Sequence, residues 1–216
     1  MTSRIYVTGF HRAGTHAFAE YKAKELGISY IEEAKIGWNS VENAVALKKG
    51  KIKIWDNKLS NFRTYIKLSL LDGYVAQCPG LSHKAIELSK HGKVYWVTRN
   101  IKDVVTSMRN GHFNQMTWDL MKDLKSEFPD DPIWEKISYS DGRHDQVCNY
   151  VGYYTLFCNV KQYFYEKYLK PYVTKIITEE QSYYKSESTI SIKRPMRPRE
   201  QEQYENYVKA WEVLDI

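Results

Sequence analysis

The segment Gly9–His16 (GFHRAGTH) combines two glycines, an arginine and two imidazoles, and it directly follows a short β-rich run, Arg4–Thr8. A turn from strand into helix points backbone N–H groups into a concavity, and the helix N-terminus adds positive potential, so phosphate or sulfate groups are favoured there. The glycines have the G-x4-G spacing of a Walker A loop, but Thr15 and His16 stand where that motif has Lys and Ser or Thr. The cation is instead Arg12, inside the loop. The segment therefore predicts an anion site that lacks the usual lysine clamp on the β- and γ-phosphates.

A second candidate follows another predicted strand, Val94–Thr98. Arg99 comes directly after it, Asn100 is suited to cap the helix that begins there, and Ser107 lies two turns into that helix. The ends of parallel strands share one edge of a sheet, so these residues are expected at the same edge as the first loop. A guanidinium fork and a hydroxyl at that edge can hold a second phosphate. Taken alone, the run also fits an arginine that caps a helix and a serine on a solvated face.

Together the two segments resemble the PAPS-dependent sulfotransferase family, and the resemblance covers most of residues 4–109. The family's 5′-phosphosulfate loop reads P-K/R-S-G-T-T. The residues that match it here are His11, Arg12, Ala13, Gly14, Thr15 and His16. The family's 3′-phosphate element reads R-N/D-P-x-D-x-x-x-S, and Arg99–Ser107 (RNIKDVVTS) matches it with the same offset from Arg to Ser. Gln77-Cys78-Pro79, followed by a predicted helix, is similar to the family's K-x-P segment.

The resemblance implies an enzyme that transfers a sulfuryl group from PAPS (3′-phosphoadenosine 5′-phosphosulfate) to a hydroxyl or amine acceptor and releases PAP. It implies that the loop residues, Arg99 and Ser107 contact the cofactor, and it implies no metal. Arg12 is expected to stabilise the bridging oxygen on which negative charge develops. The acceptor is expected to be a hydroxyl of a small molecule, a glycan or a peptide.

The catalytic base is expected in the Glu32–Glu33 pair, just after a second predicted strand. Sulfotransferases that modify protein tyrosines carry a Glu-Glu pair at similar spacing from the loop arginine, and their second Glu is the base, which corresponds to Glu33. Two adjacent, partly buried carboxylates can raise the pKa of one toward a useful value. His83 is the second choice, because the cytosolic branch of the family uses a His. A solvated acidic turn is the other interpretation of the pair.

The basic run Lys193–Arg199 (KRPMRPR) lies where the cytosolic branch has a C-terminal loop that reaches the 3′-phosphate. The resemblance therefore implies Lys193 and Arg194 as further cofactor contacts. A solvated tail fits the same run.

These residues need a sheet to bring them together, and the chain alternates strands with helices. The predicted strands are 4–8, 28–31, 51–55, 73–77, 94–98 and 173–178. The predicted helices are 15–26, 41–48, 81–91, 100–109, 146–169 and 200–213. This pattern predicts an α/β protein with a three-layer P-loop-type fold, in which helices flank a central parallel β-sheet. Residues 1–216 are expected to form a single domain, with a polar insertion or lid at 110–145 that shapes the acceptor site.

Composition narrows the class of protein. A chain of 216 residues with 43% hydrophobic and 27% charged residues is typical of one soluble globular domain. The net charge of +6 comes without a Lys/Arg block interleaved with aromatics in the first 190 residues, which gives little support for nucleic-acid binding. Three cysteines without metal-type spacing favour reduced thiols in the cytoplasm. No apolar run of about 18 residues or signal-peptide pattern is present, so no membrane segment is expected.

Two other functions fit the same residues. A P-loop nucleotide kinase with an atypical loop would turn over ATP with Mg²⁺, and the missing lysine at position 15 counts against it. A catalytically degenerate relative would bind a nucleotide or a sulfated ligand without turnover. Ala13 in place of Ser and His16 in place of Thr favour that interpretation.

Overall fold

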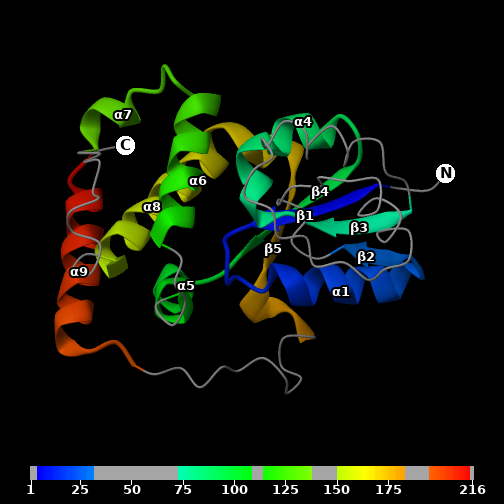
Figure 1. Ribbon diagram of the computed structural model, residues 1–216, viewed down its shortest axis with the longest axis horizontal. Helices are drawn as coiled ribbons and strands as arrows, with labels where there is room; N and C mark the ends of the chain where they lie inside the picture. The colour runs from blue at the N-terminus through cyan, green and yellow to red at the C-terminus, as the bar shows by residue number, and fades with distance from the viewer. Residues whose placement is uncertain (1–3, 32–72, 109–113, 138–149, 183–194, 215–216) are drawn as a thin grey trace. The chain divides into compact units, whose positions relative to one another are not determined.

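The computed structural model describes residues 4–31, 73–108, 114–137, 150–182 and 195–214 (Figure 1). The predicted strand at 51–55 and the predicted helix at 41–48 lie outside these residues. The chain divides into two compact units. The first unit is Met1–Arg99 with Tyr168–Ser188, and the second is Asn100–Lys167 with Thr189–Ile216. The prediction of a single domain stays a prediction.

The first unit is built on a parallel sheet, as predicted, with five strands in the described residues. In spatial order its strands are β2 (Ser29–Ile31), β3 (Tyr74–Gln77), β1 (Ile5–Gly9), β4 (Lys93–Thr98) and β5 (Thr174–Ile177). In the central strand, Val7 is in register with Gln77 on one side and Tyr95 on the other. All five residues of β1 are buried, which is typical of a parallel strand covered on both faces.

Helices cover both faces of this sheet, which makes the three layers of the predicted fold. Helix α1 (Thr15–Leu26) packs on β1, β2 and β3 through Phe18, Ala19 and Ala23, which are buried. It ends at Gly27, as predicted, where the left-handed backbone (φ 64°) suits glycine. The turn η1 (Pro79–Lys84) leads into α4 (Ala85–Ser89), which contacts β4. Figure 1 shows α1 and α4 on opposite sides of the strands.

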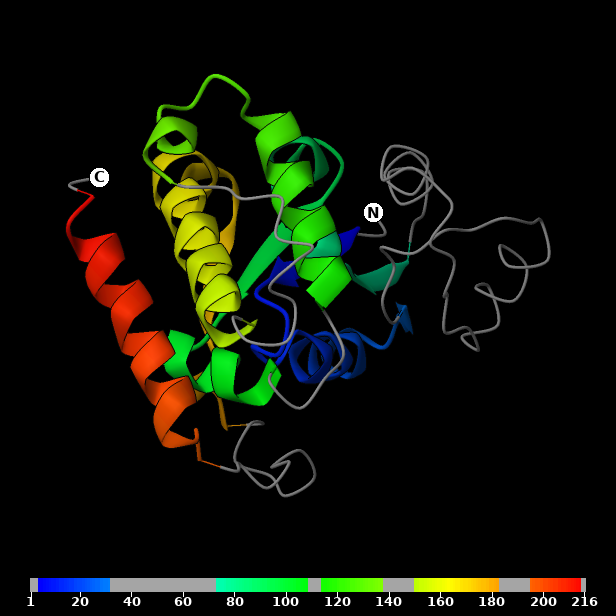
Figure 2. The same cartoon turned by 60° about the vertical axis from the view of Figure 1, so that its left-hand side comes forward.

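The described part of the second unit is helical. Its helices are α5 (Ile101–Met108), α6 (Asn114–Glu127), α7 (Ile133–Lys136), α8 (Tyr150–Phe164) and α9 (Pro198–Glu212). Helix α8 contacts α5, α6 and α9, and Figures 1 and 2 both show α8 beside α9. At that contact a Cβ on Gly152 would lie 2.2 Å from the Tyr207 ring, so only glycine allows the two helices to approach this closely.

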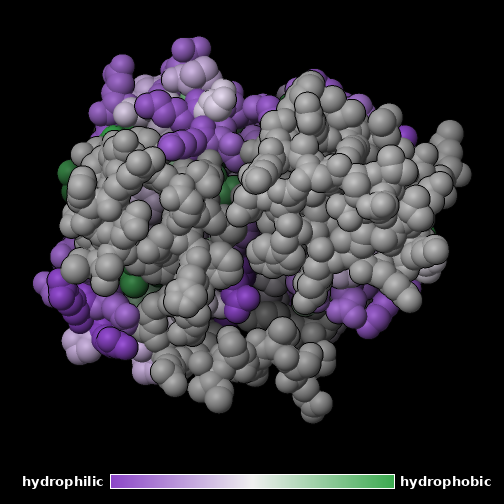
Figure 3. All heavy atoms as spheres, in the orientation of Figure 1, coloured by the Kyte–Doolittle hydropathy of each residue, from purple (hydrophilic) through white to green (hydrophobic). Residues whose placement is uncertain are grey.

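The predicted insertion at 110–145 includes α6 and α7, and its role as a lid stays a prediction. None of the helices in the described ranges could span a membrane. In Figure 3, the described residues that reach the surface on the side shown are mostly hydrophilic.

Candidate functional site

The chain leaves β1 through a glycine that touches the neighbouring strand. Gly9 has φ 121°, and a Cβ there would lie 2.0 Å from the Val97 carbonyl oxygen. The next residue is fixed to the same strand, because the Phe10 N–H donates to that oxygen at 3.1 Å. The loop therefore starts from a defined position against β4.

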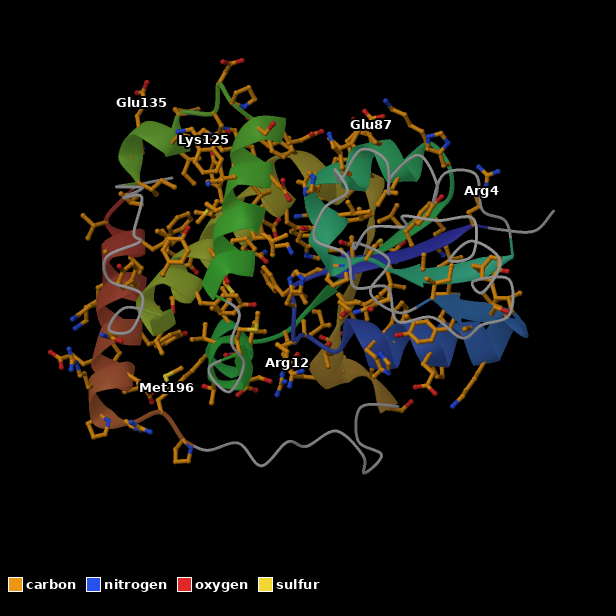
Figure 4. All side chains as sticks on the ribbon, in the orientation of Figure 1. Arg4, Arg12, Glu87, Lys125, Glu135 and Met196 are labelled. Atoms are coloured by element: carbon orange, nitrogen blue, oxygen red, sulfur yellow. The ribbon has the colours of Figure 1, made fainter. Side chains whose placement is uncertain are left out.

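Two of the next residues have left-handed backbone. Arg12 has φ 63° and Gly14 has φ 90°, on either side of the fully buried Ala13. The Ala13 N–H donates to the Phe10 carbonyl at 3.3 Å, which closes the turn. Successive N–H groups in a turn with left-handed residues form a concavity for anions. The Arg12 side chain is exposed, and Figure 4 shows it at the loop that joins β1 to α1.

Helix α1 opens directly from this loop. Gly14 is its N-cap and supplies no side-chain hydrogen bond, and the first turn contains no acidic residue. The first N–H groups of a helix have no partner within the helix, and the helix dipole makes this end positive. The end of the loop is thus a position at which an anion is stabilised.

Thr15, the first residue of α1, is held by the end of β3. Its side chain is buried, and the Gln77 amide donates to Thr15 Oγ1 at 3.0 Å. One residue further, the Cys78 N–H donates to the Val7 carbonyl at 2.8 Å and continues the pairing of β1 with β3. The sequence alone places Gln77 only at the lysine position of the family's K-x-P segment, and sequence reasoning missed this contact.

The end of β5 also supports the loop. The Thr178 side chain is fully buried, and its hydroxyl donates to the Ala13 carbonyl. A Cβ on Gly14 would lie 3.2 Å from Thr178 Cγ2, so the loop packs tightly on this residue. The two partners are 165 residues apart in the sequence, and no local pattern pointed to Thr178.

Arg99 follows β4 at the same edge of the sheet. Its side chain is 7% exposed, and its Nε lies 3.9 Å from Glu179 Oε1. The connection from β1 leads to β2 on one side of the sheet, whereas the chain after β4 returns as β5 on the other side. Ligands of open α/β sheets bind where the connections after two neighbouring strands lead to opposite sides of the sheet in this way. The loop and Arg99 stand on either side of that point.

The two loop histidines differ in their surroundings. His11 is 7% exposed and lies within the loop. His16 is exposed, with its Nδ1 2.6 Å from the Tyr30 hydroxyl and its Nε2 3.9 Å from Glu20 Oε2. The imidazole of His16 is therefore engaged with β2 and with the next turn of α1, so a contact between this ring and a cofactor stays a prediction.

For the other predicted residues, a place in this cluster stays a prediction. Asn100 caps α5 as predicted, because its Oδ1 accepts from the Lys102 N–H at 3.0 Å. Ser107 is half-buried on α5 in the second unit, and its pairing with Arg99 stays a prediction. His83 is buried in η1. The remaining predicted site residues, which lie outside the described residues, are Glu32, Glu33, Lys193 and Arg194.

The chemistry of the cluster suits an anion. The part of the chain that the structure describes contains no group of three or more His, Cys, Asp or Glu side chains placed to hold a metal ion. The loop and Arg99 offer backbone N–H groups, a helix N-terminus and two guanidinium groups. That of Arg12 is exposed and that of Arg99 is buried. These are donors for phosphate or sulfate groups.

Comparisons with known proteins give a likeness in fold. No protein-family model matches this sequence, and no curated protein matches it. Among solved structures, shikimate kinase from Acinetobacter baumannii, in complex with shikimate, aligns with 13% identity over 79% of this chain and 95% of that chain, with a TM-score of 0.38. This likeness concerns the fold alone.

Proposed function

We propose that this chain is a sulfotransferase that transfers a sulfuryl group from PAPS to a hydroxyl or amine acceptor. The observation that carries the proposal is the pair of features suited to anions at the ends of the neighbouring strands β1 and β4, after which the chain leads to opposite sides of the sheet. The loop after β1 opens into α1 without a side-chain cap, and the largely buried Arg99 directly follows β4. Two such features suit a ligand with two separate phosphate groups, and PAPS has a 5′-phosphosulfate and a 3′-phosphate.

The residues have distinct proposed roles. The loop backbone from Arg12 to Thr15 and the N-terminus of α1 would hold the 5′-phosphosulfate. Arg99 would hold the 3′-phosphate with its guanidinium fork. PAPS supplies the sulfuryl group when bound. Arg12 would stabilise the negative charge that develops on the bridging oxygen as the S–O bond breaks, and Glu33 remains the proposed base for the acceptor proton.

A P-loop nucleotide kinase is the second candidate. The observation in its favour is the Gly9–Gly14 spacing, with Gly14 left-handed directly before the helix. Against it stands Thr15 at the lysine position, where the hydroxyl is bound to Gln77. Such a kinase would have to neutralise the β- and γ-phosphates without the lysine that this loop type uses.

Thermal unfolding with PAP, and separately with ATP and Mg²⁺, distinguishes the two. A ligand at 100 times its dissociation constant adds about 2.7 kcal/mol, which raises the midpoint of a chain of this size by about 5–10 °C. We expect the rise with PAP, and we expect Arg99→Ala to abolish it. Arg4→Ala is the matched control, because Figure 4 shows Arg4 and Arg12 at opposite ends of β1. A rise with ATP and Mg²⁺ alone would favour the kinase, and no rise with either would contradict both.

Turnover separates the enzyme from a degenerate relative. If PAP binds but PAPS is never converted to PAP with any hydroxyl or amine acceptor, the chain is a binding protein, as Ala13 and His16 would allow. If both Glu33→Gln and Glu32→Gln left turnover intact in an active enzyme, His83 would become the proposed base.

A further inference from the structure

Glu179 stands beside the arginine that the proposed function assigns to the second phosphate. The two side chains come from neighbouring strand ends, Arg99 after β4 and Glu179 after β5. Arg99 is almost fully buried, whereas the Glu179 side chain is 41% exposed. Arg99 Nε and Glu179 Oε1 are 3.9 Å apart, so the two opposite charges face each other as a long ion pair.

The backbone at Glu179 is held in place through the preceding residue, Thr178. Glu179 belongs to the 3-10 turn η4 (Thr178–Glu180), and the Gln181 N–H closes this turn on the Thr178 carbonyl at 3.1 Å. Thr178 is itself buried against the loop through its bond to Ala13. One short turn therefore contacts both anion-binding features. The backbone of Glu179 is thus held by the turn, whereas its side chain is exposed.

We infer that the Glu179 carboxylate competes with the second phosphate of the ligand for Arg99 and so lowers the affinity of this site for a ligand with that phosphate; this rests on the proposed function. An exposed carboxylate is a weak partner for a guanidinium, whereas a phosphate forms charge-assisted, bidentate bonds with it. A 3′-phosphate therefore displaces the Glu179 side chain toward water. A ligand without that group leaves the Arg99–Glu179 pair in place and gains nothing from Arg99.

Binding of PAP and of adenosine 5′-phosphate, which lacks the 3′-phosphate, tests this by calorimetry. We expect Glu179→Gln to bind PAP about fivefold more tightly than the unaltered chain, because a weak competing ion pair is removed. Its affinity for adenosine 5′-phosphate should stay within about twofold, because that ligand does not use Arg99. Glu180→Gln is the matched control, since it removes the same charge from the next, exposed residue of the turn. It should change neither affinity.

Each result has one meaning. A gain with PAP in Glu179→Gln alone supports the inference, as does PAP binding that appears only in that variant. Equal gains in Glu179→Gln and Glu180→Gln, or a gain with adenosine 5′-phosphate as large as that with PAP, would show a general charge effect and overturn it. If Arg99→Ala weakens PAP binding but Glu179→Gln leaves it unchanged, the proposed function stands and the inference is wrong. If PAP binds neither the unaltered chain nor Glu179→Gln, both fail.

Discussion

Gly9 and Gly27 both have positive φ, at 121° and 64°, but their surroundings differ. A Cβ on Gly9 would meet the backbone of β4, whereas a Cβ on Gly27 would have nothing within 4 Å. A side chain at position 9 would thus clash with β4 as well as strain the backbone, whereas a side chain at position 27 would only strain the backbone. At the scale of the residue, the missing Cβ of Gly9 allows both the packing of β1 against β4 and the start of the loop at the site.

Substituting these glycines gives the first prediction. Gly9→Ala should lower the free energy of unfolding by about 3 kcal/mol or more, because strand β4 must move away from the loop. Gly27→Ala should lower the free energy of unfolding by only about 1 kcal/mol, because alanine is strained in the left-handed backbone conformation. Urea denaturation of both variants measures the difference. Equal losses of unfolding free energy in the two variants would mean that a Cβ at position 9 does not clash with β4.

A buried thiol gives a prediction of pH dependence. Cys158 on α8 is fully buried, and burial raises the pKa of its thiol from 9.0 to about 12, although Lys161 and a hydrogen bond with Tyr154 act in the opposite direction. The folded chain therefore holds this proton where the unfolded chain releases it. The resulting stabilisation is complete below pH 9 and is lost as the pH rises toward 12.

We therefore expect the urea midpoint of the unaltered chain to fall more steeply above pH 9 than that of Cys158→Ala. The variant is needed because tyrosines and lysines titrate in the same range, and burial also raises the pKa of Tyr204. Identical slopes for the two proteins would contradict a buried, protonated Cys158.

At the scale of the element, the end of β5 and the turn η4 decide how firmly the loop is held. The loop gains support from three strand ends, because Val97 on β4, Gln77 on β3 and Thr178 after β5 each bond to it. Of these contacts, the hydrogen bond from Thr178 is made to the carbonyl of Ala13, which lies between the left-handed residues Arg12 and Gly14. This is the part of the loop expected to face a bound anion.

Thr178→Val tests this support. The substitution keeps the shape but leaves the buried Ala13 carbonyl without its donor, so the free energy of unfolding should fall by about 1–3 kcal/mol. PAP affinity should fall as well, because the loop backbone is no longer held in one conformation. Thr178→Ser keeps the hydroxyl and should retain PAP affinity. If calorimetry shows the same PAP affinity in Val and Ser variants, the bond does not position the loop.

In the second unit one carboxylate links three elements. Asp131 is buried, and its Oδ1 accepts from the Ile133 N–H of α7 at 2.9 Å. Its carboxylate also accepts from the Tyr163 hydroxyl at 3.1 Å and from Lys167 at 2.9 Å. The hydrogen bonds with Tyr163 and Asp131 raise the pKa of Lys167 above its usual value.

Asp131→Ala should therefore lower the free energy of unfolding by about 2–3 kcal/mol, since it leaves the buried Ile133 N–H without its acceptor and removes the bonds to Tyr163 and Lys167. Asp130→Ala, at the exposed neighbouring carboxylate, should change it by less than about 0.5 kcal/mol. Chemical denaturation of both variants gives the comparison. A loss in Asp130→Ala as large as in Asp131→Ala would point to net charge instead of these bonds.

The elements that carry local signals could be predicted from the sequence. The turn at Gly9–Gly14, the stop of α1 at Gly27 and the cap of α5 by Asn100 each depend on residues a few positions apart. The contacts of Gln77, Thr178 and Glu179 could not be predicted, because they depend on how distant strands pair. Periodicity shows that a strand exists and does not show which residue at its end will touch a loop.

At the scale of the whole molecule, the chain passes from the first unit to the second at Arg99 and returns at Tyr168. The first unit is therefore made from two separate stretches of sequence. Strand β5, which pairs Thr174 with Tyr95 of β4, belongs to the later stretch. The candidate site includes residues from both stretches.

This discontinuity has a consequence for synthesis. On the ribosome Ala13 emerges early, but the hydroxyl that holds its carbonyl belongs to a residue 165 positions later. At about 5–20 residues per second, on the order of 10–30 s of translation separate the two. A nascent chain released before β5 would carry the glycine loop and Arg99 without the third support, and it should bind PAP poorly even where its early strands have paired.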